Sequence, residues 1–246
     1  MELEKGWQRR FNELALRHSE PHAMSHWTRH GFKIRVKYLS VEAAKRYRKG
    51  QRILDLGSGP GNCASWFEDQ VLFDFSFNAL NKIPATCRAA KVCGDFQSLP
   101  FFDKSFDGVV CVGLFQCHRL CMEHLRGLWR ALKPGAWFLV ETLNCEWHGL
   151  ISDMDALQQR RYIEFLEADS EGVCYFVHNG CFVFYHPERL ARWFGAAGFI
   201  VEGYSYLYTL NQTASLFRVP FNRVGYLNQK GKIFARSFYI YGRKSP

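Results

Sequence analysis

Three glycines at alternate positions follow an apolar stretch and could bring the backbone close to a nucleotide-like ligand. The stretch reads Ile-Leu-Asp-Leu-Gly-Ser-Gly-Pro-Gly over residues 53–61. Glycine adopts backbone conformations closed to other residues and has no Cβ, so main-chain N–H groups can approach a ligand closely. The sequence therefore predicts a cofactor-binding turn that contains five residues: Asp55, Gly57, Ser58, Gly59 and Gly61.

An acidic residue stands at the end of the next apolar stretch, which we expect to be a strand over Val71–Phe75. There the carboxylate of Asp74 could accept hydrogen bonds from both ribose hydroxyls of an adenosine. We predict that Asp74 binds the ribose and that Phe75 and Ser76, which follow it, contribute to the same site.

A third expected strand, Ala90–Cys93, leads through a glycine to Asp95 and Phe96. An acceptor and an aromatic ring at this point could hold an adenine by its exocyclic amine and its face. A fourth expected strand, Phe106–Gly113, would bring Gly113 to the same edge of a parallel sheet. We therefore predict Asp95, Phe96 and Gly113 as further cofactor contacts.

Further short motifs follow in order along the chain. They are Leu99-Pro-Phe101, Ser105-Phe-Asp107, Leu132-Lys-Pro-Gly135, His186-Pro-Glu-Arg-Leu190 and Ala197-Gly-Phe199. With the pieces above, the chain resembles the class I S-adenosylmethionine-dependent methyltransferases, in particular the broad small-molecule group that includes ubiquinone-biosynthesis enzymes. The resemblance covers roughly residues 50–245. It implies S-adenosylmethionine as the cofactor.

The resemblance also implies an α/β fold. We expect a Rossmann-like, seven-stranded, mostly parallel sheet with helices on both faces, an antiparallel last strand and an N-terminal helical lid. A dinucleotide-binding fold is the rival, but its turn reads G-x-G-x-x-G, whereas this one reads G-x-G-x-G. The separation of Gly57 from Asp74 leaves room for a helix of only about two turns between them.

Length and composition suit one domain. The chain has 246 residues, of which 48% are hydrophobic, and we expect a single methyltransferase domain over 1–246. Its parts would be an N-terminal extension (1–50), a cofactor-binding half (51–143) and a substrate-side half (144–246). No apolar run reaches the roughly 18 residues that span a bilayer, and residues 1–5 do not read as a secretion signal. We therefore expect a cytoplasmic protein with reduced cysteines.

Positive charge is concentrated at the two ends of the chain. Residues 1–52 hold 13 Lys and Arg against 5 Asp and Glu, and residues 218–246 hold 7 against none. Such ends could attract RNA, an anionic membrane surface or an acidic small molecule. They could equally be an ordinary solvated surface, and the sequence leaves this open.

Aromatic residues are frequent in the N-terminal extension, including Trp27, His30 and Tyr38. In the resembled group such an extension packs over the cofactor, which would make these three residues candidates for cofactor or substrate contact. Simple packing of an amphipathic helix explains them as well.

The segment between the expected fifth strand and the last expected helix, Asn144–Tyr185, is longer than a plain connection and is a candidate for substrate selection. After an expected fifth strand (Ala136–Thr142), the expected elements are a helix (Ser152–Ala168), a hairpin (Val173–Val177 and Cys181–Tyr185), a helix (His186–Ala197) and two closing strands (Ile200–Tyr208 and Phe234–Gly242). The turn of the hairpin contains Asn-Gly, a strong signal for a tight turn. The basic loop Thr209–Lys232 is a further candidate for a functional segment.

A protein base is optional for this chemistry, because the cofactor itself activates the transferred methyl group. A candidate should follow the fourth strand, where Gln116 and His118 stand. Cys117, Cys121 and His124 would share a helix face if this region were helical, but zinc usually takes four ligands in paired short spacings. Packing of small thiols explains them more simply, as it does Cys145 beside His148, and we predict no metal.

The leading hypothesis is a methyltransferase that acts on a small-molecule acceptor through an oxygen, nitrogen or carbon nucleophile. A second hypothesis keeps the chemistry and makes the acceptor RNA or tRNA, held by the basic ends. A third is a methyltransferase-like binding protein without turnover.

Overall fold

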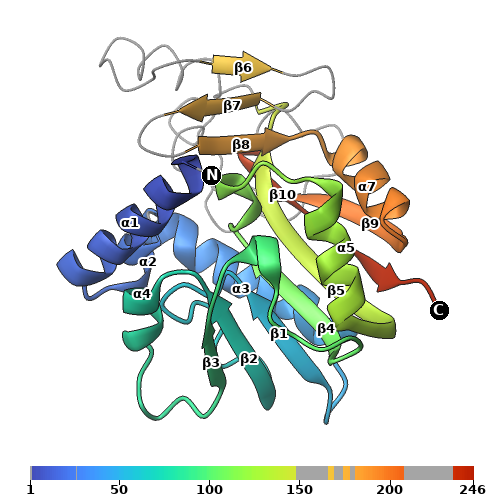
Figure 1. The fold of residues 1–246 in the computed structure, drawn as a ribbon, viewed down its shortest axis with the longest axis horizontal. Helices are drawn as coiled ribbons and strands as arrows, with labels where there is room; N and C mark the ends of the chain where they lie inside the picture. Colours follow the sequence, from blue (N-terminus) through green and yellow to red (C-terminus); the bar gives the residue numbers. More distant parts are fainter. Residues whose placement is uncertain (1, 26, 148–165, 169–173, 178–180, 208–234) are drawn as a thin grey trace, which may run out of the picture.

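The computed structural model describes residues 2–25, 27–147, 166–168, 174–177, 181–207 and 235–246 (Figure 1). Its strands are β1 (Arg52–Leu56), β2 (Asp69–Asp74), β3 (Ala90–Cys93), β4 (Phe106–Val112), β5 (Leu132–Asn144), β6 (Leu166–Ala168), β7 (Cys174–Val177), β8 (Cys181–Tyr185), β9 (Phe199–Leu207) and β10 (Ser237–Lys244). Its helices are α1 (Glu2–Arg17), α2 (Pro21–Met24), α3 (Arg29–Arg46), α4 (Phe77–Asn81), α5 (Met122–Ala131) and α7 (Pro187–Ala196), with 3₁₀ turns η1 (Phe96–Ser98) and η2 (Phe115–Cys117).

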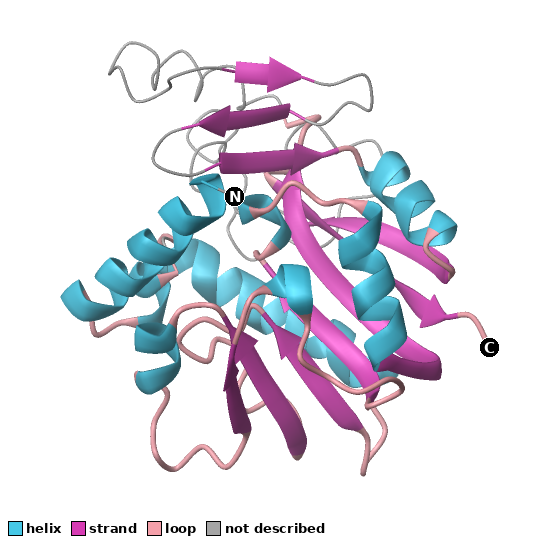
Figure 2. Ribbon diagram, viewed as in Figure 1, coloured by secondary structure: helices cyan, strands magenta, loops and turns pink. Residues whose placement is uncertain are grey.

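One sheet runs through the molecule (Figure 2). Strands β3, β2, β1, β4 and β5 lie side by side and are all parallel, and β10 pairs antiparallel with both β5 and β9. This seven-stranded core confirms the predicted mostly parallel sheet with an antiparallel last strand. The parallel strands bring their C-terminal ends to one edge, where open α/β sheets bind their ligands.

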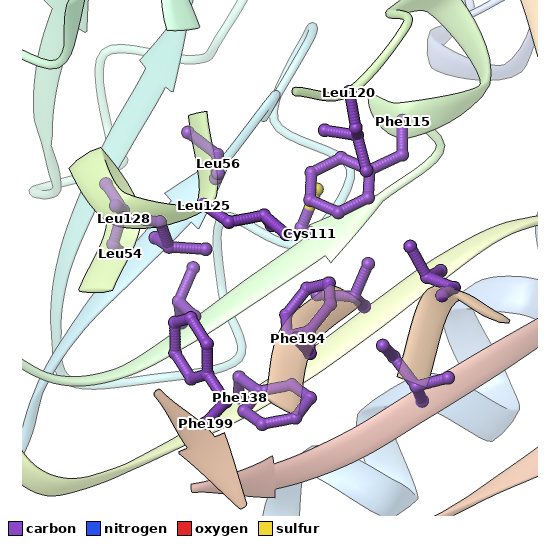
Figure 3. Close-up of a cluster of buried hydrophobic side chains, with 14 of the residues drawn as sticks. Leu54, Leu56, Cys111, Phe115, Leu120, Leu125, Leu128, Phe138, Phe194 and Phe199 are labelled. Atoms are coloured by element: carbon purple, nitrogen blue, oxygen red, sulfur yellow. The ribbon is translucent and has the colours of Figure 1, made fainter. Parts of the chain in front are cut away.

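Helices cover both faces of the sheet. The helices α5 and α7 supply Leu125, Leu128 and Phe194 to the larger apolar cluster, where they pack on strand residues such as Phe138 (Figure 3). On the other face α3 contributes to a second cluster, which includes Leu39. The two faces of the sheet are therefore sealed by different parts of the chain, and α3 is tied to the face opposite α5 and α7 (Figure 1).

Three further strands extend the sheet beyond the C-terminal end of β5. There β8 runs parallel to the last two residues of β5, and β7 and β6 follow as antiparallel neighbours. The predicted hairpin is confirmed as β7 and β8, while its turn lies outside the described residues. The sheet thus has ten strands rather than the predicted seven.

The prediction of a helix over Ser152–Ala168 is wrong at its end, because Leu166–Ala168 form strand β6 and pair with β7. Pairing with a distant strand overrides local helix preference here. Residues 152–165 and the whole of the predicted loop Thr209–Lys232 lie outside the described residues. The described strands β9 and β10 confirm the two predicted closing strands to within three residues at their ends.

A helix does not follow the glycine turn, which corrects the expectation of about two helical turns before β2. Residues 59–65 form successive turns. In these turns the N–H groups of Gly61 and Ala64 donate to oxygens three residues earlier, on Ser58 and Gly61, over 3.0 and 3.1 Å. The positive φ angles of Gly59 (53°) and Gly61 (84°) keep this segment out of the right-handed helical region.

The fifth strand begins earlier than predicted. It starts at Leu132, directly after α5, whereas the sequence indicated a turn over residues 132–135 and a strand from Ala136. Gly135 has a φ of +75°, and the pairing of β4 with β5 shifts register beside Gly108, so the expected irregularity lies within the strand.

No helix among the described residues combines the length and the hydropathy that a bilayer crossing requires.

Candidate functional site

A pocket with about 510 Å³ of empty space opens at the C-terminal ends of β1, β2 and β4. Its described lining is Phe11, Met24, Ser25, Trp27, Gly57, Gly59, Pro60, Asn62, Asp74, Phe75, Ala79, Val112, Gly113, Leu114, Gln116 and Cys117. The pocket therefore joins the glycine turn, the end of β2 and the segment after β4, as the sequence predicted for Gly57, Gly59, Asp74, Phe75, Gly113 and Gln116.

Asp74 joins two walls of this pocket. Its Oδ2 accepts a hydrogen bond from the Gly59 N–H at 2.8 Å, and its Oδ1 accepts one from the Ser76 N–H at 2.8 Å. Burial raises the pKa of Asp74 to about 6, although these N–H groups and the nearby His118 lower it. The Phe75 N–H also interacts with this carboxylate. Because an ionised carboxylate offers about four acceptor positions, it can still accept from a ligand hydroxyl.

Asp55 is fully buried beneath the turn and is not part of the pocket wall. Its Oδ2 accepts a hydrogen bond from Gln70 Nε2 at 3.4 Å, while its Oδ1 has no hydrogen bond from any described residue. Burial, followed by the charge of Asp74, raises the pKa of Asp55 to about 8. Asp55 is therefore mostly protonated at pH 7 in the absence of a nearby cation.

Two glycines are required by the shape of the pocket. Gly57 has a φ of +79°, and a Cβ there would lie 2.8 Å from Leu114 Cβ. Gly113 has a φ of +80°, and a Cβ there would lie 2.7 Å from an indole carbon of Trp27. Both positions thus need a residue without a side chain, for backbone conformation and for space.

Substitution of Gly57 by alanine is expected to destabilise the fold more than substitution of Gly50 by alanine. Both glycines have similar φ angles, +79° and +85°, but a Cβ at Gly50 would meet nothing within 4 Å. Gly50→Ala should therefore cost only the left-handed strain of about 1–2 kcal/mol, and Gly57→Ala should add the clash with Leu114. Urea unfolding of the two variants checks this, and equal losses would contradict it.

The N-terminal helix α1 is hydrogen-bonded to the loop after β2. Gln8 Nε2 donates to the carbonyl of Phe75 at 3.1 Å, and Asn12 Oδ1 accepts from Ser76 Oγ at 2.9 Å. Ser76 also caps α4, so its side chain serves the fold and is not on the pocket wall. The sequence analysis did not identify Gln8 or Asn12, because polar residues on an amphipathic helix carry no sign of their partner.

The segment between α2 and α3 closes the pocket beside the glycine turn. Ser25 Oγ accepts a hydrogen bond from Asn62 Nδ2 at 2.8 Å. Trp27 covers Gly113, and the guanidinium of Arg35 lies 4.9 Å from the centre of a Trp27 ring. Of the three aromatic candidates of the extension, Trp27 lines the pocket, whereas His30 and Tyr38 are not among the lining residues.

A buried ion pair holds α3 to the sheet near Trp27. Arg35 Nε lies 3.0 Å from Glu141 Oε1, and the side chains of Arg35 and Glu141 are 7% and 0% exposed. The backbone carbonyl of Glu141 also accepts a hydrogen bond from the Gly113 N–H at 3.2 Å. This pair therefore links α3, which begins beside Trp27, to the part of β5 that is hydrogen-bonded to Gly113.

Substitution of Arg35 by methionine is expected to destabilise the fold by about 3–5 kcal/mol, because it leaves the Glu141 carboxylate buried without its cation. Chemical denaturation measures the loss. The double variant Arg35→Met/Glu141→Leu removes both charges and should recover much of the stability. A double variant as unstable as the single one would show that the pair is not the cause.

The two catalytic candidates after β4 lie in different places. Gln116 lines the pocket, whereas His118 is 3% exposed and lies behind the wall, with its ring 6.2 Å from Phe75 and 6.0 Å from Phe96. Tyr185 of β8 fixes this segment, since its hydroxyl donates to the His118 carbonyl at 2.6 Å and accepts from the Leu120 N–H at 3.2 Å.

Several predicted cofactor residues lie beside the pocket rather than on its described wall. Asp95 is exposed, and its Oδ1 accepts from the Gln97 N–H at 2.9 Å. The ring of Phe96 is buried and stacks on Phe115 and His124. Ser58 and Gly61 belong to the turn but are not lining residues.

The cysteines and histidine considered as metal ligands do not share one helix, which corrects that premise. Cys117 is in η2, Cys121 caps the N-terminus of α5 and His124 is in its first turn. His124 Nδ1 accepts a hydrogen bond from the Cys121 N–H at 3.1 Å, so the ring serves as part of the helix cap. Within the described residues, no cluster of three or more His, Cys, Asp and Glu could hold a metal ion. His148, the partner considered for Cys145, lies outside the described residues.

Comparison with known proteins matches the part of the chain that contains the glycine turn, Asp74 and the segment after β4. A family model described as a methyltransferase domain matches residues 54–140. The ubiquinone/menaquinone biosynthesis C-methyltransferase UbiE of Vibrio cholerae is 34% identical over 110 residues, which are 38% of this chain and 41% of that protein. The demethylmenaquinone methyltransferase of Deinococcus radiodurans is 26% identical over 163 residues, 61% of this chain and 68% of that protein.

Solved structures show the same fold. An S-adenosylmethionine-dependent methyltransferase from Mesorhizobium loti superposes with a TM-score of 0.59 at 14% identity, covering 85% of this chain and 98% of that one. Apart from the Deinococcus protein, the curated relatives are matched over less than half of their own length.

Proposed function

Because the chain belongs to the class I S-adenosylmethionine-dependent methyltransferases, we propose that it transfers the methyl group of S-adenosylmethionine to a small-molecule acceptor with an apolar body. The observation that carries the proposal is the pocket at the C-terminal ends of β1, β2 and β4. It combines a glycine-rich turn with a buried carboxylate at the end of the second strand.

The residues of the pocket fit this cofactor. Asp74 can still accept hydrogen bonds from the ribose hydroxyls. Gly57, Gly59 and Gly113 let the backbone approach the ligand, and Trp27 covers it from the N-terminal side. The cofactor supplies a sulfonium methyl that is already activated, so the protein contributes position and the exclusion of water.

The acceptor side of the pocket suits an apolar molecule. Phe11, Met24, Trp27 and Phe75 are on the described wall, which contains no lysine or arginine. Gln116 is the polar group after β4, and its amide can orient an acceptor by hydrogen bonds but does not take up a proton at neutral pH. One relative above is named for ubiquinone and menaquinone biosynthesis and the other for demethylmenaquinone, which supports an apolar acceptor.

Calorimetric titration with S-adenosylmethionine and, separately, with NAD tests the proposal. We expect micromolar binding of S-adenosylmethionine and no binding of NAD. Binding of NAD alone would overturn the assignment of the site. Transfer of a labelled methyl group to an apolar ring acceptor then tests turnover, and strong cofactor binding with no transfer to any acceptor would favour a binding protein.

A further inference from the structure

Exposed cations follow one side of α3 at a spacing of four residues. Arg29, Lys33 and Lys37 are all exposed, and so is Lys45 at the end of the helix, although each step of four residues turns the row by about 40° around the axis. We call these four residues the α3 cation line. Arg29, Lys33 and Lys37 form no ion pair with any described acid, whereas Lys45 pairs with Glu42.

This arrangement costs helix stability. Like charges four residues apart destabilise a helix by about 0.2–0.5 kcal/mol per pair, and the helix has no acidic residue in its first turn to offset them. The opposite side of α3 is already used, since Leu39 and Ala43 are buried against the sheet. The cation line therefore remains free to meet an anionic surface.

The position of the line connects it to the pocket. Thr28 caps α3, and Trp27, the residue before it, lines the pocket. Arg29 thus stands next to the pocket in the chain, and the line extends from there along the helix. Between Lys37 and Lys45 the same side presents Val41, a hydrophobic residue that is 52% exposed.

We propose that the α3 cation line docks the protein on an anionic lipid bilayer, from which an apolar acceptor enters the pocket. This inference rests on the proposed function. Each lysine or arginine near a bilayer of anionic lipids adds to binding, and an exposed apolar residue among the cations adds contact with the lipid. A bilayer is also where an apolar acceptor is concentrated.

A nucleic acid fits these observations less well. An RNA acceptor would bring phosphates to a pocket whose described lining has no lysine or arginine and has the carboxylate of Asp74. Val41 in the middle of the line also offers nothing to a phosphate backbone.

Sedimentation of the full chain with lipid vesicles tests the docking. Vesicles with about one third phosphatidylglycerol should bind the protein at about 0.1 M salt and release it at about 0.5 M, and phosphatidylcholine vesicles should bind it weakly. Lys33→Gln/Lys37→Gln should weaken binding by about 25-fold, since each cation contributes about fivefold. The matched control is Arg126→Gln/Arg192→Gln, which removes two exposed cations from α5 and α7 on the other face of the sheet and should change binding little.

The proposal is overturned by absence of binding to anionic vesicles, by equal losses in the two double variants, or by poly(U) RNA binding that depends on Lys33 and Lys37 while vesicle binding does not. Titration of Lys33→Gln/Lys37→Gln with S-adenosylmethionine should give the parental affinity. A parent that binds the cofactor but no vesicles refutes the docking alone, whereas a parent that binds vesicles but no cofactor refutes the proposed function.

Discussion

Asp74→Ala is expected to weaken S-adenosylmethionine binding by more than a hundredfold. The proposed role gives its carboxylate two hydrogen bonds to the ribose, and each charge-assisted bond contributes about 1.5–3 kcal/mol. The substitution also frees the N–H groups of Gly59 and Ser76, which hold the turn against β2. Calorimetry measures the affinity, and circular dichroism shows whether the fold is kept.

Two further variants separate these effects. Asp69→Ala removes an exposed carboxylate at the opposite end of β2, where it lies 4.0 Å from Arg52, and should leave cofactor affinity unchanged. Asp74→Asn keeps one oxygen that can accept from a backbone N–H, so it should fold better than the alanine variant yet bind the cofactor poorly. If folded Asp74→Ala binds S-adenosylmethionine as well as the parent does, Asp74 is not the ribose ligand.

Local patterns were sufficient to predict most of the fold. Apolar runs bounded by turn residues identified the strands β1 to β4 and the β7–β8 hairpin, because these signals depend on neighbouring residues. The prediction failed in two places for different reasons, one a distant pairing and the other a local backbone conformation. Leu166–Ala168 are a strand because they pair with β7, and the segment after β1 lacks a helix because its glycines have positive φ angles.

Among the site residues, too, some are marked by local sequence patterns and others are decided by contacts with distant residues. Gly57, Gly59, Asp74 and Gly113 were predicted as cofactor contacts and Gln116 as a catalytic candidate because each follows or ends a strand, and all five line the pocket. The Arg35–Glu141 pair was missed, since its members are 106 positions apart and nothing local marks a buried ion pair. Phe96 and His118 lie behind the wall, because an aromatic residue after a strand can turn equally well toward the core.

Asp55→Asn is expected to stabilise the ligand-free protein at pH 8 and to leave it nearly unchanged at pH 4. The pKa of Asp55 is raised from 3.8 to about 8 by burial and by Asp74. As pH rises between these values, the unfolded chain loses its proton while the folded chain keeps it. The parent therefore loses about 1.4 kcal/mol of stability per pH unit from this group, whereas asparagine has no proton to lose.

Asp107→Asn is the matched control with the opposite sign. Burial raises the pKa of Asp107, but hydrogen bonds from Lys133 and from the Arg52 N–H outweigh it and hold the pKa below its usual value. Asp107 therefore stabilises the fold at neutral pH and loses this contribution in acid, so Asp107→Asn should destabilise the protein at pH 7. Urea unfolding across pH should give both variants the parent's free energy of unfolding in acid. Above pH 5 this free energy should be higher than the parent's for Asp55→Asn and lower for Asp107→Asn. If both variants were less stable than the parent above pH 5, Asp55 would be ionised in the folded protein, with a positive charge close to it.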